Sequence, residues 1–337
     1  MPQARRHTRP PTPPSEGTAL IDILSATVPI FLIVGTGFAV TRAGILKRRD
    51  ISVLATYVIR VALPALIFVN VAGRSIGDIL NPTYLLTYAI SAMAMTGLAI
   101  LFSRARQIPP ARAATIALAA CGTNNGFVGF PIFLLVLPAV AGLAVGMDML
   151  VDSIVILPIA LAMFESVSGR SRRWGRHLAG TAVRVIRQPM VIAIILGIAF
   201  GAIGFTLPTM IDRAVTLIAD SSPAVALFAI GGMLVGLRVR GQRAQLAVTV
   251  TAKLLVMPAI SVALVLILPR LGLPELSQEL RAAAILTGAL PSMSSVAALA
   301  EQYGEGDFGA AAMMLSTVAA FFTLTGWMFA LSAIGWL

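Results

Sequence analysis

In the middle of an apolar segment near residues 112–137 stands the run Gly122-Thr123-Asn124-Asn125-Gly126-Phe127-Val128-Gly129-Phe130-Pro131. Three glycines, two adjacent amides and a proline make a poor continuous helix, because proline lacks an N–H and disrupts the bond to the carbonyl four residues back. Within a membrane, such a break is tolerated only where protein or a wet cavity satisfies the freed backbone groups. A kinked packing helix with glycines for close contact is the alternative. We favour a break that builds a binding site.

The rest of the chain has the composition of a membrane protein. Of its 337 residues 58% are hydrophobic and 12% charged, and the mean hydropathy is +0.92. In soluble domains, about 45–50% of the residues are apolar and about 25% are charged. Segments long enough to cross a hydrocarbon core of about 30 Å lie near 21–41, 51–72, 83–103, 112–137, 142–168, 189–206, 211–236, 246–269, 280–300 and 308–335. We therefore expect an all-α integral membrane protein with ten transmembrane helices.

The distribution of charge and loop length predicts the domains and the orientation. We expect a disordered basic tail over 1–19, a five-helix repeat over 20–168, a basic cytoplasmic linker over 169–188 and a second five-helix repeat over 189–337. Because each repeat has an odd number of crossings, the second repeat starts on the opposite side of the membrane, and the two repeats must be inverted. The loops on one side carry sixteen Lys and Arg residues, and those on the other side, with the tail, carry seven. Because positive residues favour the cytoplasm, we predict a protein of the cytoplasmic membrane with both termini outside. The net charge of +11 then indicates basic loops, not nucleic-acid binding.

A second polar break, Leu290-Pro291-Ser292-Met293-Ser294-Ser295, lies in the ninth segment. Aligning 111–121 with 280–290 matches five of eleven residues and places Ser292 opposite Thr123. Interrupted helices at equivalent positions of inverted repeats are typical of secondary transporters. Half-helix N-termini attract anions, and amides both donate and accept. The predicted substrate site comprises Thr123, Asn124, Asn125, Pro131, Pro291, Ser292, Ser294 and Ser295.

Charged residues inside the apolar segments form a second set of candidates, since such residues usually face a pathway or the bundle interior. They are Arg60, Asp148, Asp152, Asp220 and Lys253. Asp148 and Asp152 are four apart and so share one helix face. Arg60 and Asp220 occupy similar depths in the two halves, and they form either a structural ion pair or part of the transport route. An aspartate could carry a coupling proton; sodium, or no coupling ion, stays open.

Several other classes of protein are disfavoured by the sequence. Its one cysteine, Cys121, and its histidines, His7 and His177, leave no disulfide framework, zinc-protease motif or serine-protease triad. We predict no enzyme, no cofactor and no metal site. A channel for ions or solutes would need a continuous polar face, and a sensor that binds an anion without transporting it remains a further alternative.

Three stretches carry a family resemblance: TNNGFVGFPIFLL (123–135), ALFAIGGMLVGL (226–237) and the C-terminal stretch that begins GALPSMSS and covers 288–331. They resemble the auxin efflux carrier family, whose bacterial members are permeases for malate, malonate and similar acids. In that family an asparagine matches Asn124 and prolines match Pro131 and Pro291. The chain departs from the plant pattern in its second amide, Asn125, and in lacking a charged residue within the third helix.

The resemblance implies a ten-helix inverted repeat related in fold to bile acid/sodium symporters. Helices 1, 2, 6 and 7 would form a scaffold, and helices 3–5 and 8–10 an elevator-like transport domain in which helices 4 and 9 cross. We therefore expect secondary active transport of a small organic anion, a malate-, malonate- or auxin-like mono- or dicarboxylate, by alternating access. The expected partners are the carboxylate, the lipid bilayer and, as an open alternative, a second copy in a homodimer.

Overall fold

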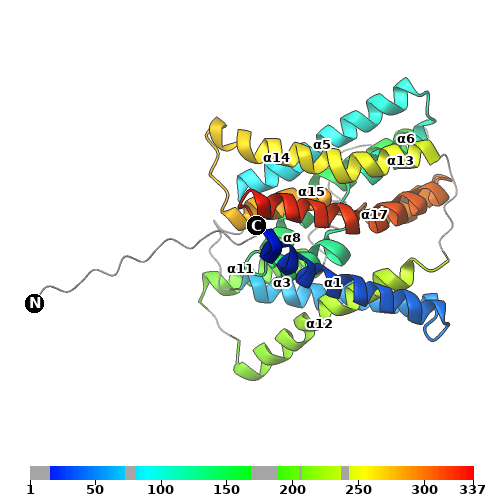
Figure 1. The fold of residues 1–337 in the computed structure, drawn as a ribbon. Coiled ribbons are helices and arrows are strands. Elements are labelled where there is room, and N and C mark those ends of the chain that lie inside the picture. Colours follow the sequence, from blue (N-terminus) through cyan, green and yellow to red (C-terminus); the bar gives the residue numbers. More distant parts are fainter. Residues whose placement is uncertain (1–15, 73–80, 168–188, 205–206, 237–242) are drawn as a thin grey trace, which may run out of the picture.

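The computed structural model describes residues 16–72, 81–167, 189–204, 207–236 and 243–337, and the regular elements there are all helices. The helices lie side by side as a bundle (Figure 1). Six are long and apolar enough to cross a membrane: Arg48–Val71, Pro82–Ala105, Ala141–Val167, Thr209–Met233, Arg243–Leu271 and Gly306–Ala333. Shorter apolar helices of 10–17 residues cover Val28–Arg42, Pro110–Cys121, Asn125–Val136 and Pro189–Ala202. A multi-pass helical membrane protein is confirmed, whereas ten crossings remain a prediction.

The boundaries differ from the sequence-based ones at the N-terminal end. Helix α1 (Glu16–Arg42) begins inside the segment expected to be a tail. The expected linker over 169–188 lies outside the described residues.

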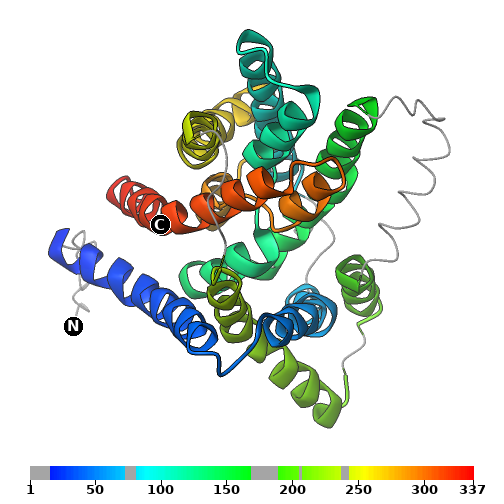
Figure 2. The same ribbon diagram turned by 90° about the vertical axis from the view of Figure 1, so that its right-hand side faces the viewer.

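The helices pack in two groups, seen in Figure 2 as the lower and upper halves of the molecule. In the α1–α12 group, α12 packs against α1, α2 and α3, and α3 packs against α11. This group comprises α1, α2 (Arg48–Tyr57), η1 (Val58–Ala62), α3 (Leu63–Val71), α11 (Pro189–Ala202) and α12 (Thr209–Met233).

In the α5–α17 group, α5 contacts α6 and α14, and α17 contacts α13, α15 and α16. Its first half holds α5 (Pro82–Ala105), α6 (Pro110–Cys121), η2 (Asn125–Gly129), α7 (Phe130–Val136), α8 (Ala141–Val151), η3 (Asp152–Ile156) and α9 (Leu157–Val167). Its second half holds α13 (Arg243–Thr251), η4 (Ala252–Val256), α14 (Met257–Ile267), η5 (Pro269–Leu271), α15 (Gln278–Ala289), α16 (Ser295–Glu301) and α17 (Gly306–Ala333).

Four π-helical turns, η1 to η4, interrupt these helices, and each ends two residues before a proline. The prolines are Pro64, Pro131, Pro158 and Pro258. A proline cannot donate to the carbonyl one turn back and clashes with it, and a wider π turn relieves that clash. Each π turn also carries one candidate from the sequence, in order Arg60, Asn125, Asp152 and Lys253.

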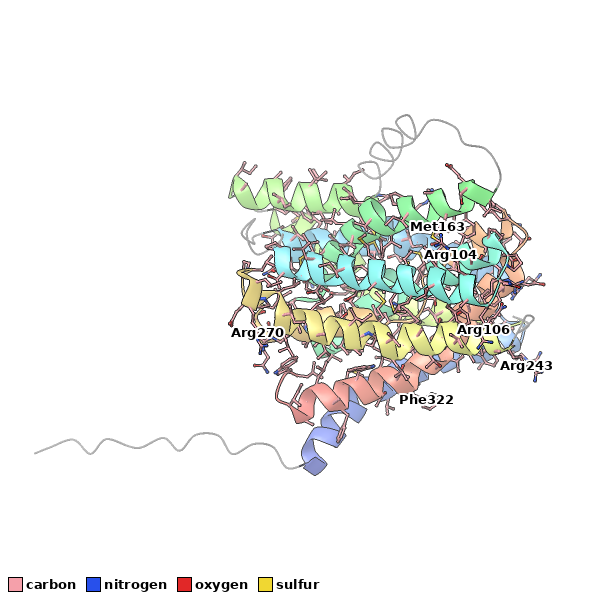
Figure 3. The ribbon with its side chains drawn as sticks, turned by 90° about the horizontal axis from the view of Figure 1, so that it is seen from above. Arg104, Arg106, Met163, Arg243, Arg270 and Phe322 are labelled. Carbon is pink, nitrogen blue, oxygen red and sulfur yellow. The ribbon has the colours of Figure 1, made fainter. Side chains whose placement is uncertain are left out.

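The arginines labelled in Figure 3 are distributed unequally between the two ends of the bundle. Figure 3 places Arg104, Arg106 and Arg243 at one end and Arg270 at the other. At the basic end Arg112 forms an ion pair with Glu305. The described basic residues around 104–112, together with Arg243, thus lie at one end, while the orientation in a membrane stays a prediction.

Candidate functional site

The two polar breaks lie against each other and are joined through their backbones. Helix α6 ends at Cys121, and α15 ends at Ala289; the residues that follow each end are extended. The Asn124 N–H donates to the Pro291 carbonyl at 2.9 Å, and the Met293 N–H donates to the Gly122 carbonyl at 3.3 Å. Thr123 and Ser292 form an antiparallel bridge between them. Each break therefore satisfies backbone groups that the other leaves free, as burial requires.

Two glycines permit this close approach. A Cβ atom at Gly122 would lie 2.7 Å from Met293 Sδ, and one at Gly129 would lie 2.5 Å from Leu290 Cδ1. The Ser292 hydroxyl donates to the Ala119 carbonyl at 2.6 Å and so caps the end of α6. These contacts position the breaks and leave other side chains free to face a cavity.

A cavity of about 360 Å³ opens beside the breaks. Five of the predicted site residues line it: Thr123, Asn124, Asn125, Ser294 and Ser295. Asp152 lines it as well. Pro131, Pro291 and Ser292 are buried outside its lining, so the last two act on the site through the backbone geometry.

The two adjacent amides offer unused hydrogen-bonding groups. The Asn124 side chain makes no hydrogen bond with any described residue and lines the cavity. Asn125 donates through Nδ2 to Asp152 Oδ2 at 2.9 Å, while its Oδ1 has no partner among the described residues. A ligand in the cavity therefore meets free amide donors and acceptors, groups that bind carboxylates and hydroxyls.

A second cavity of about 450 Å³ adjoins the first and shares Ile59, Phe127, Ser294 and Ser295 with it. It extends to Arg48 and Gly232, at the start of α2 and the end of α12. The Arg48 guanidinium donates to the Val235 carbonyl at 2.7 Å, which holds a positive charge at this mouth. The shared lining makes a route from the breaks towards the basic end.

Each of the two buried aspartates bonds to a tyrosine of α5 and lies beside a threonine of a broken segment. Tyr88 donates to Asp152 Oδ1 at 2.5 Å, and its hydroxyl lies 2.6 Å from that of Thr123. Tyr84 donates to Asp148 Oδ1 at 3.1 Å, and Thr287 donates to Asp148 Oδ2 at 2.9 Å. The four-residue spacing predicted the shared face of the aspartates correctly.

The buried lysine lies near both aspartates without forming an ion pair with either within the described residues. The Lys253 ammonium is fully buried and donates to Met257 Sδ at 3.0 Å and to the Gly288 carbonyl at 3.4 Å. Gly288 is in the last turn of α15, whose free carbonyls attract a cation. Lys253 thus caps the half-helix that leads into the second break.

Arg60 and Asp220 are exposed, and the described residues contain no ion pair between them. Their helices are linked instead by the Tyr57 hydroxyl, 2.9 Å from that of Ser221. Neither residue lines either cavity. In this conformation the pair stands apart from the site.

Sequence reasoning missed Tyr84, Tyr88 and Thr287. A signal was present, because Tyr84 and Tyr88 have the same spacing of four as the aspartates that they contact. Before Arg104 in its last turn, α5 contains no charged residue, yet it supplies the two phenol hydroxyls.

Comparison with known proteins places this chain in a family. Residues 22–176 and 176–328 match the family model described as Membrane transport protein. The chain is 24% identical to a "Putative malonate transporter" of Rhizobium meliloti (strain 1021) over 91% of this chain and 95% of that protein. It is also 24% identical to "Lysosomal cholesterol signaling protein" of Mus musculus, over 90% of this chain and 37% of that protein. The chain therefore belongs to the membrane transport protein family, the auxin efflux carrier-type family that its broken segments resemble.

Proposed function

We propose that the protein is a secondary active transporter of a small carboxylate and binds its substrate where the two breaks meet. The observation that carries the proposal is the cavity at the bonded breaks, lined by Thr123, Asn124, Asn125 and two serines. Broken helices that meet beside a polar cavity suit substrate binding at mid-membrane. The likeness to a protein named as a putative malonate transporter supports a small dicarboxylate.

Inverted repetition supports the same proposal. Thr123 and Ser292, equivalent in the sequence alignment, also pair directly. A second aligned pair, Arg112 and Arg281, lies at opposite ends of the bundle. Arg112 pairs with Glu305, which precedes α17, whereas Arg281 stacks on Trp336, which follows α17. We propose ten crossings in two inverted repeats with crossed fourth and ninth helices, in a cytoplasmic membrane with both termini outside.

Alternating access would be a movement of the α5–α17 group past the α1–α12 group. The site residues on the breaks belong to the α5–α17 group, while Ile59 and Met190 on the far wall of the cavity belong to the α1–α12 group. The route to Arg48 runs between the groups. In this conformation the site would open towards the cytoplasm.

The test is uptake of labelled malonate and a panel of related acids into proteoliposomes that hold the purified protein. Asn124→Ala should abolish saturable uptake, because it removes the free amide from the cavity. Asn70→Ala is the matched control: the Asn70 amide donates to the Leu66 carbonyl of its own helix, away from the cavity. Both variants should elute as folded protein in detergent.

Three results would overturn the proposal. Full uptake by Asn124→Ala would remove the site assignment. A flux that rises without saturation would indicate a channel. Substrate-induced thermal stabilisation without any uptake would indicate a sensor.

A further inference from the structure

The hydrogen atoms available to the two buried aspartates differ, although their surroundings look alike. Around Asp148, three oxygen–oxygen contacts close a ring: Tyr84 to Asp148 at 3.1 Å, Thr287 to Asp148 at 2.9 Å and Tyr84 to Thr287 at 3.0 Å. Three hydrogen bonds need three hydrogens. The two hydroxyls supply one each, and an ionised carboxylate supplies none. The ring is therefore complete only when Asp148 carries a proton.

Asp152 can complete its hydrogen bonds in either protonation state. As a carboxylate it accepts from Tyr88 and from Asn125, and the Thr123 hydroxyl donates to Tyr88. As an acid it donates to Tyr88, and Tyr88 in turn donates to Thr123. In this reversed chain, the protonated carboxyl oxygen and the two hydroxyl oxygens each carry one hydrogen. No buried polar group loses its hydrogen-bond partner, a loss that would be costly.

The reversal has a consequence at the cavity, which Asp152 and Thr123 line and Asp148 does not. When Tyr88 donates to Thr123, the hydrogen of the Thr123 hydroxyl is released from Tyr88 and can point at a ligand. Protonation of Asp152 thus adds a donor to the cavity and removes a negative charge from its wall. Both changes favour an anion.

We propose that Asp152 takes up one proton with each substrate anion, through the chain Asp152–Tyr88–Thr123, and that Asp148 is a permanently protonated structural acid. This inference rests on the proposed transport function and makes it a proton–carboxylate symport. The proton forms an O–H bond at Asp152 on binding and leaves that oxygen on release. No other covalent bond changes between the end states.

The balance of charge in the buried core agrees with the proposal. Without substrate, the Asp152 carboxylate and the Lys253 ammonium offset each other, and protonated Asp148 is neutral. With a dicarboxylate such as malonate bound as the dianion, protonated Asp152 is neutral, and Lys253 offsets one of the two substrate charges. An unprotonated Asp152 would add a further negative charge beside the anion in a medium of low dielectric constant, where the energetic cost is large.

The groups that face Asp152 come from every element packed against it. They are Tyr88 of α5, Thr123 and Asn125 of the first break, Asp148 one turn back on α8, and Lys253 of η4, which also faces Cys121 of α6. Of these, Asp148 and Lys253 are the other charged types. The hydrogen count above keeps Asp148 protonated, and the Gly288 carbonyl in the last turn of α15 favours the ammonium form of Lys253. Asp152 is left as the group that changes.

The experiment measures proton movement driven by malonate in proteoliposomes that contain trapped pyranine, together with the apparent KM for uptake at several pH values. Wild type should acidify the lumen when malonate is added outside, and KM should fall by up to about tenfold per unit decrease in pH, as linkage to one proton requires. Asp152→Asn should transport without acidification and with a KM independent of pH. Asp148→Asn should keep both responses, because its amide can supply the third hydrogen of the ring.

The opposite pattern, in which Asp148→Asn loses the acidification and Asp152→Asn keeps it, would overturn the assignment. Tyr88→Phe is the second variant in case Asp152→Asn does not fold. It removes the middle hydroxyl while both carboxyls remain, so acidification should fall at least tenfold, and an unchanged response would refute the relay. Saturable uptake by wild type without any acidification would leave the transporter proposal standing and defeat this one.

Discussion

The contact between Gly129 and Leu290 allows a quantitative test of how the two broken segments pack. A Cβ atom at Gly129 would lie 2.5 Å from Leu290 Cδ1 but 3.6 Å from its Cγ and Cδ2, so one methyl group stands in the way. Overpacking costs about 1–3 kcal/mol, and alanine in place of a helical glycine recovers about 1 kcal/mol. Gly129→Ala should therefore destabilise by about 0–2 kcal/mol. Leu290→Ala removes a fully buried side chain and should cost about 2–5 kcal/mol.

In the double variant the clash disappears, and the new methyl group fills part of the cavity left by Leu290. The double variant should be about 0.5–3 kcal/mol more stable than the sum of the single changes predicts, the range found for residues in contact. The measurement is reversible unfolding in mixed micelles. Gly97→Ala with Leu290→Ala is the control, because nothing lies within 4 Å of a Cβ at Gly97, and it should be additive. Additivity of Gly129 and Leu290 would mean that the breaks do not touch there.

Three further outcomes follow from the packing. Ser292→Ala leaves the buried Ala119 carbonyl without its side-chain donor and should lower stability by about 1–3 kcal/mol; an unchanged melting temperature in detergent would contradict this. Glu305→Gln removes the ion pair with Arg112, whose partners are 13% and 23% exposed, and should cost at most about 1 kcal/mol; a loss that does not shrink in high salt would argue against an ionic origin. Cys121 is 4% exposed, so a charged maleimide should label it only after denaturation, and rapid labelling of the native protein would disprove its burial.

The location of the candidate site could be predicted from the sequence, because glycine, proline and adjacent amides are locally incompatible with an unbroken apolar helix. The alignment placed Ser292 opposite Thr123 as equivalent positions of two repeats, and it did not predict that these two residues meet in the bridge. A local rule of this kind does not need the tertiary structure. Asn124, Asn125 and Thr123 accordingly lie where they were expected, on the wall of a cavity.

The hydrogen-bond partners of the aspartates could not be derived in this way. Tyrosine reads as an apolar residue in a hydropathy scan, and its hydroxyl finds a carboxyl only through packing of α5 on α8. Similarly, depth along two helices made Arg60 and Asp220 look like partners, yet rotation about each helix axis decides whether side chains meet. Both side chains are exposed instead.

The π turns before Pro64, Pro131, Pro158 and Pro258 each hold one residue more than an α-helical turn does. One residue corresponds to roughly 100° of rotation about a helix axis. A single helical wheel therefore cannot describe the whole of these helices, because the faces before and after the turn are offset. Replacing one of these prolines would leave the extra residue in place. Deleting one residue from the turn would rotate one half against the other and carry Asp152 or Lys253 out of register with its partners.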